Sequence, residues 1–185
     1  LVAAGVRVPQ PYGVFDGVLL MQVVCDADGN PAPRLNDVEL TPHQARGWHA
    51  FMIAQIVRML CAGLIHGDLS EFNVLVDPAG PVIIDLPQAV SAAGNNNAFR
   101  MLERDVNNMR EAFGRVAPEL LATEYAHEIW KHYEAGTLLP ESPLTGRFEH
   151  DRSEVNVVAV LDLIEDERLL AEERARRRAE TEAGV

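Results

Sequence analysis

Three polar side chains at fixed spacing could carry out chemistry in this sequence. Asp68, Asn73 and Asp85 lie in the stretch LIHGDLSEFNVLVDPAGPVIIDLPQAV, which covers residues 64–90. Phosphoryl transfer from a nucleotide needs a carboxylate that orients the attacking hydroxyl and accepts its proton, together with oxygen ligands for Mg²⁺. Asp68 suits the first task, and Asn73 and Asp85 suit the second. The spacing therefore predicts a metal–nucleotide site.

Two short strands joined by a turn must position these residues. The pattern predicts a loop over 65–73, a strand at NVLV, a turn at Pro78–Gly80 and a second strand at PVIID. Folding of this hairpin would bring Asn73 and Asp85 to one cleft.

A long helix is predicted to precede the loop. Thr41 can cap its N-terminus, Pro42 suits the first helical position, Gln44 completes a capping box and Gly63 ends the helix. Helical spacing of the apolar residues predicts one buried face, formed by Trp48, Phe51, Met52, Ile56, Met59 and Leu60.

The remaining segments divide into a hairpin and further helices. The runs YGVF and GVLLMQVV flank Asp16-Gly17, which predicts a tight β-turn. Helices are predicted at about 101–113, 118–135 and 155–182, with a linker rich in proline and glycine at 136–150. The opening LVAAGVRVP is typical of the last turn of a helix, and the first residue is Leu1, so we expect a fragment of a longer protein.

Composition excludes several classes of protein. The chain of 185 residues is 48% hydrophobic and 24% charged, which indicates one globular domain, or one large lobe plus a tail. A formal net charge of −12 makes direct nucleic-acid binding an unfavoured function. Two cysteines outside any CxxC pair and the lack of a long apolar run predict a cytoplasmic protein without a membrane segment. Its oligomeric state is not indicated.

Four segments together resemble the RIO-type atypical serine/threonine protein kinases. HGDLSEFNVL resembles the family's catalytic loop and IIDLPQ its metal loop, while LLMQVVCDADGNPAPRL resembles its hinge with the following insert and RMLERDVNNMREAF the next helix. The resemblance implies an α/β (α+β) protein-kinase-like fold with a mostly helical C-terminal lobe. Residues 1–24 would be the end of the N-terminal lobe and the hinge, 25–135 the C-terminal lobe, and 136–185 a linker and an Arg/Glu-rich helix.

The resemblance also implies residue roles. ATP with Mg²⁺ or Mn²⁺ would be the cofactors, and a protein serine or threonine, including one in the kinase itself, would be the acceptor. Asp68 would be the catalytic carboxylate, and Asn73 and Asp85 the metal ligands; in this family the aspartate matching Asp85 can itself take the phosphate. The nucleotide-binding residues would be Met21 facing the adenine, the backbone of Gln22 and Val24 holding the base, Leu75 as the pocket floor, and Ser70 near the transferred phosphate.

Departures from ordinary eukaryotic protein kinases carry information. Gly67 replaces the arginine of the H-R-D motif, which normally pairs with a phosphorylated activation loop, so control by that route is not expected. Leu86-Pro87 replaces Phe-Gly after Asp85, and proline stiffens the loop there. We expect His66 to brace the loop through hydrogen bonds, because Asp68 already fills the role of base.

Two other functions compete with a protein kinase. A small-molecule phosphotransferase of the aminoglycoside- or choline-kinase type shares the H-G-D-L and I-I-D strings, but it tends to have a histidine and an aromatic residue where Ser70 and Leu86 stand. A non-catalytic nucleotide-binding scaffold or an ATPase switch would not need Asp68, Asn73 and Asp85 together.

One part of the expected nucleotide clamp is missing. The sequence has no G-x-G-x-x-G loop, and its only lysine is Lys131, well after the catalytic loop. Kinases of this architecture hold the phosphates with both features. We therefore expect the chain by itself to be incomplete for activity.

Overall fold

The computed structural model describes residues 1–149. The chain divides into two compact units, Leu1–Phe148 and Glu149–Val185, and only the first is described below. The predicted helix at 155–182 lies outside the described residues.

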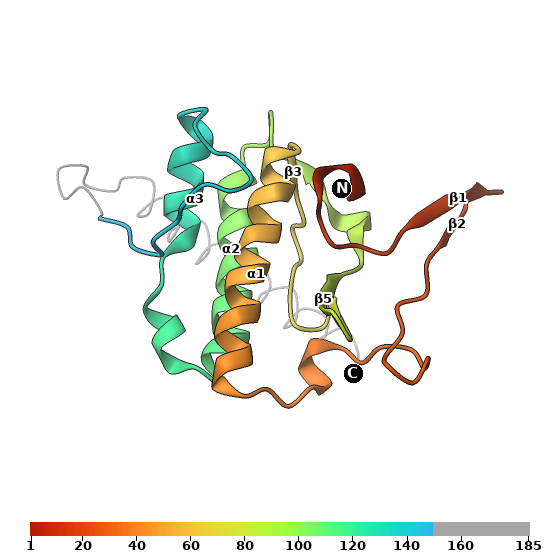
Figure 1. Ribbon diagram of the computed structural model, residues 1–185. Helices are drawn as coiled ribbons and strands as arrows, with labels where there is room; N and C mark the ends of the chain where they lie inside the picture. Colours follow the sequence, from red (N-terminus) through yellow and green to blue (C-terminus); the bar gives the residue numbers. More distant parts are fainter. Residues whose placement is uncertain (150–185) are drawn as a thin grey trace, which may run out of the picture. The chain divides into compact units, whose positions relative to one another are not determined.

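Three α-helices pack together in the first unit (Figure 1). They are α1 (Pro42–Cys61), α2 (Ala98–Gly114) and α3 (Tyr125–Glu134), and α2 packs against both of the others. The core lies between these helices and the strands that follow α1, and its largest fully buried apolar side chains are Phe113, Met52, Met59, Leu60, Ile65, Leu69, Ile83, Leu102, Met109 and Ile129. The expected combination of a helical body with small sheets is confirmed.

The predicted start of α1 is confirmed at atomic detail. The Gln44 amide donates to Thr41 Oγ1 at 3.3 Å, and the Thr41 amide donates to Gln44 Oε1 at 3.0 Å, which is a capping box. Four of the six predicted core residues of this helix are fully buried, while Trp48 and Phe51 are half-buried.

The strands form three separate antiparallel pairs. β1 (Pro11–Phe15) pairs with β2 (Val18–Met21), β3 (Leu64–Ile65) with β6 (Val90–Ser91), and β4 (Val74–Asp77) with β5 (Gly80–Ile83). In the last pair Val74 lies opposite Ile83 and Asp77 opposite Gly80. The predicted hairpins around Asp16-Gly17 and Pro78–Gly80 are both present.

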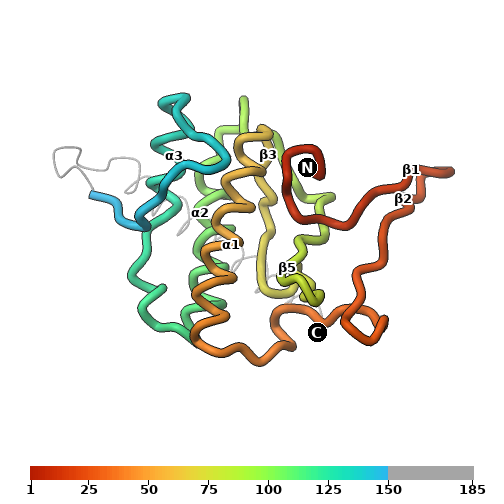
Figure 2. Tube along the Cα trace, viewed as in Figure 1, coloured from red at the N-terminus to blue at the C-terminus, as the bar shows by residue number. Residues whose placement is uncertain are grey.

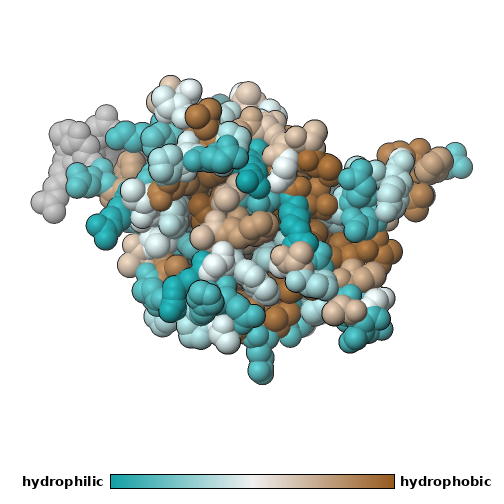
Figure 3. Space-filling view, in the orientation of Figure 1, coloured by the Kyte–Doolittle hydropathy of each residue, from teal (hydrophilic) through white to brown (hydrophobic). Residues whose placement is uncertain are grey.

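The β1–β2 hairpin projects from the helical body (Figure 2). Asp16 and Gly17 both have positive φ, 49° and 80°, as tight hairpin turns require. Apolar side chains are exposed along the hairpin and just after it, and Figure 3 shows their hydrophobic surface; they are Tyr12, Val14, Phe15, Val18, Leu19, Leu20, Met21 and Val23.

The chain before this hairpin is tied to the β4–β5 pair. This segment begins with a short 3-10 helix, η1 (Val2–Ala4). Beyond it, Arg7 Nη2 donates to both carboxylate oxygens of Asp77, each at 2.6 Å. Burial is the largest single influence and acts to raise the pKa of Asp77. The hydrogen bonds from Arg7, Ala79 and Gly80, together with the Arg7 charge, outweigh it, so this pKa lies below its ordinary value. The Ile83 amide also donates to the Arg7 carbonyl oxygen at 2.9 Å.

The helix predicted over 118–135 is wrong in one respect, because it is two elements. A 3-10 helix, η4 (Pro118–Ala122), comes first, and α3 begins only at Tyr125. The Thr123 amide and hydroxyl both donate to the Leu120 carbonyl oxygen, and the Glu124 amide donates to Gly146 instead of to a helical partner. Hydrogen bonds to a distant segment therefore interrupt a run with acceptable helix propensity.

Two further 3-10 helices complete the described unit. η2 (Leu35–Asp37) lies between the hairpin and α1, and η3 (Leu86–Gln88) follows Asp85.

Candidate active site

The 66–73 loop, from His66 to Asn73, joins β3 to β4 and is shaped first by Gly67. This glycine has a φ of +81°, a backbone conformation in which a side chain is strained. A Cβ atom there would lie 2.5 Å from Met101 Cε and 3.3 Å from the Gln88 carbonyl oxygen. The tight approach of α2 and η3 to the loop thus depends on glycine at this position.

A buried carboxylate on α2 holds the loop from below. Asp105 is 1% exposed, and its two oxygens accept hydrogen bonds from the amides of Gly67 at 2.8 Å and Leu69 at 2.9 Å. Asn108, one turn further along α2, donates from Nδ2 to the Leu69 carbonyl oxygen at 2.8 Å. Burial raises the pKa of the Asp105 carboxyl, and the two amides offset that only in part.

The role of Asp105 was not predicted from the sequence. The signal was a single acidic residue in the apolar stripe of an amphipathic helix, since its helical neighbours Leu102, Val106 and Met109 are all buried. A charge on such a stripe needs partners, and the exposed amides of a glycine loop supply them.

His66 connects the loop to the segment that carries Asp85. Its Nε2 lies 2.9 Å from the Ile84 carbonyl oxygen, and the Asp68 amide donates to its Nδ1 at 3.4 Å. The ring is 2% exposed and bridges two backbone groups. The prediction that His66 braces the loop is confirmed by this geometry.

Asn73 closes the loop on itself and on β5. Its Nδ2 donates to the Asp68 carbonyl oxygen at 2.8 Å, and its amide donates to the Ser70 carbonyl oxygen at 3.0 Å. The Ile84 amide donates to the Asn73 carbonyl oxygen, also at 3.0 Å. Together with the His66 contacts, these bonds join Asp68, Asn73 and Ile84 in one small ring of hydrogen bonds, next to Asp85.

Asp85 has a left-handed backbone, with φ 63° and ψ 56°. Within residues 1–149 Asp16 is the one other non-glycine residue with a positive φ. Aspartate tolerates this conformation better than most residues, but it still costs energy, and such strain gathers at functional sites. Asp68 and Asp85 are both exposed, and neither carboxylate accepts a hydrogen bond from another residue of the described part.

The side-chain oxygens of Asp85 and Asn73 suit Mg²⁺ better than a transition metal. No group of three or more His, Cys, Asp or Glu residues within 1–149 could hold a metal ion by protein ligands alone. Mg²⁺ is commonly held by one or two carboxylates with the remaining positions filled by water and substrate phosphates. A carboxylate from Asp85 and an amide oxygen from Asn73 are a donor set of that kind.

Of the predicted adenine-binding residues, Met21 ends β2, Gln22 and Val24 follow it, and Leu75 lies on β4. The Gln22 amide donates to the Gln10 carbonyl oxygen at 2.8 Å, and the Val24 carbonyl oxygen accepts from the Ala32 amide at 2.9 Å. Leu75 packs against a small buried cluster of Val24, Ala32 and Val82. The segment after β2 and the β4–β5 pair therefore meet at the residues that the resemblance implies.

Comparison with known proteins identifies the family. A model of the RIO domain matches residues 1–126, which is more than half of the chain. The chain belongs to the RIO family. The expected kinase-like fold is confirmed with it, and the antiparallel pairs and helices described above agree with that fold.

Several RIO kinases are similar in sequence. The chain is 39% identical over 112 residues to the RIO-type serine/threonine-protein kinase Rio1 of Haloferax volcanii, covering 60% of this chain and 37% of the relative. The Thermoplasma acidophilum Rio1 is 36% identical over 110 residues, covering 60% and 55%. Human serine/threonine-protein kinase RIO1 is 35% identical over 113 residues, covering 60% and 20%. The match thus spans less than two thirds of each relative.

No helix among the described residues is long and apolar enough to cross a lipid bilayer.

Proposed function

We propose that this RIO-family chain supplies the catalytic carboxylate and metal ligands for transfer of phosphate from ATP to serine or threonine of a protein, including the kinase itself. The observation that carries the proposal is the ring of hydrogen bonds that joins Asp68, Asn73 and the residue before Asp85. Two stretches of sequence, the 66–73 loop and Ile84–Asp85, meet there with two exposed carboxylates. The names of the relatives as serine/threonine kinases support the same reaction.

Asp68 has the position of a base in this proposal. Its carboxylate is exposed, while its backbone is fixed on both sides by His66 and Asn73. It would orient the acceptor hydroxyl and accept its proton as the bond to phosphorus forms. Fixing the backbone limits the motion of the side chain, and such positioning accounts for much of the catalysis in phosphoryl transfer.

Asn73 and Asp85 would hold Mg²⁺, with Mn²⁺ as a substitute. A metal held there would neutralise charge on the nucleotide phosphates. The strained backbone of Asp85 sets the direction of its carboxylate, and the Asn73 side-chain nitrogen is already used by Asp68. The Asn73 amide oxygen is then the atom left for the metal.

The adenine would bind to the segment after β2. Two backbone groups there have no hydrogen-bond partner among residues 1–149, namely the Gln22 carbonyl oxygen and the Val24 amide. An acceptor and a donor two residues apart match the amino group and the ring nitrogen of adenine. Met21 and Leu75 would contact its two sides, and Ser70 would lie near the transferred phosphate.

Substitution of Asp68 tests the proposal. In the complete protein, Asp68→Asn should retain nucleotide binding and lower turnover by at least about 10²-fold, which is the usual contribution of a positioned base. The measurement is phosphate transfer from labelled ATP beside nucleotide affinity by calorimetry. Asp28→Asn, in the exposed turn after β2, is the matched control.

Transfer by the Asp68→Asn protein at the parental rate would refute the proposed base. A panel of protein, aminoglycoside and amino-alcohol acceptors should give phosphoprotein only, and labelled antibiotic or amino alcohol would instead support a small-molecule phosphotransferase.

A further inference from the structure

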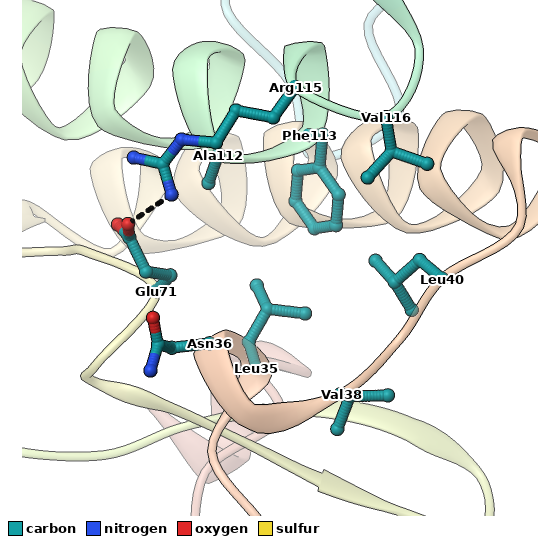
Figure 4. A pocket seen from close by; sticks show the side chains of 9 residues that line it. All are labelled: Leu35, Asn36, Val38, Leu40, Glu71, Ala112, Phe113, Arg115 and Val116. Carbon is teal, nitrogen blue, oxygen red and sulfur yellow. Dashed lines mark hydrogen bonds and ion pairs between the residues drawn. The ribbon is translucent and has the colours of Figure 1, made fainter.

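A cavity of about 160 Å³ lies beside the 66–73 loop (Figure 4). Residues from η2 and the segment that follows it form one wall, and the C-terminal end of α2 forms the other. The apolar lining residues are Leu35, Val38, Leu40, Ala112, Phe113 and Val116. None of them belongs to the proposed catalytic or nucleotide-binding residues.

The cavity has the size and chemistry of a pocket for one apolar side chain. An apolar cavity of about 150 Å³ accommodates a benzene-sized group. Leu35 and Phe113, 5% and 1% exposed, form its buried part, whereas Val38, Leu40 and Val116 are only half-buried. An entering leucine or phenylalanine side chain would cover these half-buried side chains.

The end of the cavity nearest the 66–73 loop is closed by a charged pair. Arg115 donates from Nη1 to Glu71 Oε1 at 2.8 Å, and Figure 4 shows the two side chains meeting there. The Asn36 amide also donates to the Glu71 carbonyl oxygen, at 3.3 Å. The wall of the cavity and the 66–73 loop are therefore joined through Glu71.

This connection limits how far the cavity can be from the acceptor site. Glu71 follows Asp68 by three residues, and consecutive Cα atoms are about 3.8 Å apart, so their Cα atoms lie within roughly 11 Å of each other. An extended peptide advances about 3.3–3.6 Å per residue. A peptide with its hydroxyl at Asp68 would reach the cavity with a residue about three to five positions away.

The charge around the cavity indicates what should flank that residue. Val38 and Leu40 line the cavity, and the two residues beside them, Asp37 and Glu39, are exposed. Val38 has an extended backbone, with φ −105° and ψ 127°, in which neighbouring side chains point to opposite sides. The two acidic side chains therefore lie on the outer side of the segment that lines the cavity, and their negative charge there attracts lysine or arginine in a partner.

We propose that this cavity is a substrate-docking subsite that takes one apolar side chain, flanked by basic residues, of the protein being phosphorylated. The inference rests on the proposed kinase function, because it takes the distance to Asp68 as the distance to the acceptor hydroxyl. It names a class of substrate segment that the catalytic residues do not specify.

Peptide binding to the 185-residue chain tests the subsite without requiring catalysis. The probes are fluorescent peptides with one serine, two arginines and a leucine placed about three to five residues to either side of the serine. At one spacing, the leucine peptide should bind about tenfold or more tightly than its alanine counterpart, because burial of a leucine is worth at least that factor. Replacing the arginines by glutamates should weaken binding further.

Two variants assign such a preference to the cavity. Ala112→Leu fills it and should remove the advantage of the leucine peptide, while Ala122→Leu on the exposed face of η4 should leave it intact. Val38→Thr keeps the side-chain volume but adds a hydroxyl to the lining. It should also reduce the advantage of the leucine peptide, and it tests the cavity even if Ala112→Leu unfolds the chain. Asp37→Lys with Glu39→Lys should reverse the preference for basic flanks.

Equal binding of the leucine and alanine peptides at every spacing would overturn the proposal. So would a leucine-peptide advantage that persists in both Ala112→Leu and Val38→Thr. So would self-association of the chain that Ala112→Leu abolishes, because a second copy would then occupy the cavity. The proposed kinase function can fail separately. In that case the complete Asp68→Asn protein would transfer phosphate at the parental rate, while the 185-residue chain would still bind the leucine peptide more tightly than the alanine peptide.

Discussion

Asp105 shows at the level of one residue how the 66–73 loop is kept in place. Its carboxylate accepts from two loop amides although burial disfavours its ionised form. The loop amides and the carboxylate need each other, because each would otherwise be a buried polar group without a partner.

Asp105→Asn should weaken this support with little change in side-chain volume. An asparagine can accept from one loop amide, but it turns an NH₂ group toward the other, so we expect a loss of about 1–3 kcal/mol in the free energy of unfolding. Urea denaturation of the variant beside Glu111→Gln, an exposed substitution on the same helix, measures the difference. In the complete protein turnover should fall as well. Equal stability of the two variants would show that the hydrogen bonds of Asp105 contribute nothing to the free energy of unfolding.

The proposed metal ligands should be separable from the proposed base by their response to metal concentration. Asp85→Asn and Asn73→Ala should each weaken Mg²⁺-dependent nucleotide binding, and raising Mg²⁺ should partly restore binding by the Asn73→Ala variant through mass action. Nucleotide affinity measured across a Mg²⁺ titration, with Asp68→Asn as the control that keeps the parental metal dependence, checks this. An unchanged metal dependence in both ligand variants would place the metal elsewhere.

Packing of the three helices depends on a buried histidine. His49 on α1 lies 6.0 Å from the Phe113 ring of α2 and 5.7 Å from the Tyr125 ring of α3, measured between ring centroids. Burial, with a contribution from the Arg110 charge, lowers its pKa to about 4. Its Nε2 has no hydrogen-bond partner among the described residues, so protonation would place a charge in the helix interface.

The described unit should therefore lose stability in mild acid. The unfolded chain binds a proton at His49 near pH 6.5, while the folded chain does so only near pH 4, so this contribution is complete above pH 6.5 and is lost as the pH falls toward 4. The loss approaches about 3 kcal/mol, from roughly 1.4 kcal/mol per pH unit. Urea unfolding at several pH values should show a shallower acid dependence for His49→Gln, whereas His43→Gln, at an exposed position, should follow the parental curve. Identical curves for all three proteins would contradict the assignment.

Local chemistry made most of the elements predictable from the sequence. Thr41 and Gln44 marked the start of α1, and Asp16-Gly17 marked the first hairpin, because each of these signals acts within a few residues. The break between η4 and α3 was not predictable, since the Glu124 amide bonds to Gly146, a residue far along the chain. Asp105 was missed for the same reason: its partners, Gly67 and Leu69, are joined to it only by the fold. The roles of Asp68, Asn73 and Asp85 stay predictions, although their backbones meet as expected.

At the scale of the whole molecule, none of the strands within residues 1–149 carries a lysine that could hold the nucleotide phosphates. The single lysine, Lys131, lies on α3 with its Nζ 5.7 Å from the Phe148 ring centroid. Arg7 is held by Asp77. The exposed apolar β1–β2 hairpin is also the kind of surface that a further sheet would cover, because an isolated two-stranded hairpin is only marginally stable.

The 185-residue chain alone should therefore bind ATP weakly and transfer phosphate at a negligible rate. Fusing it to an upstream lobe that carries a glycine-rich loop and a strand lysine should restore both, because these groups hold the phosphates. Nucleotide affinity and phosphate transfer, compared between the chain and the fusion, measure the effect, and a fusion with the strand lysine changed to methionine is the control. Robust transfer by the chain alone would point to a different phosphate anchor.

The conformation of Gly67 limits how this RIO-family chain could come under phosphorylation control, by evolution or by protein engineering. Installing the arginine of ordinary kinases here would force a side chain onto a backbone with φ +81°, at a cost of about 1–2 kcal/mol. The new Cβ would also displace Met101 and press on the backbone oxygen of Gln88. A switch of that type therefore needs several coordinated mutations, and each intermediate variant would have a disturbed 66–73 loop.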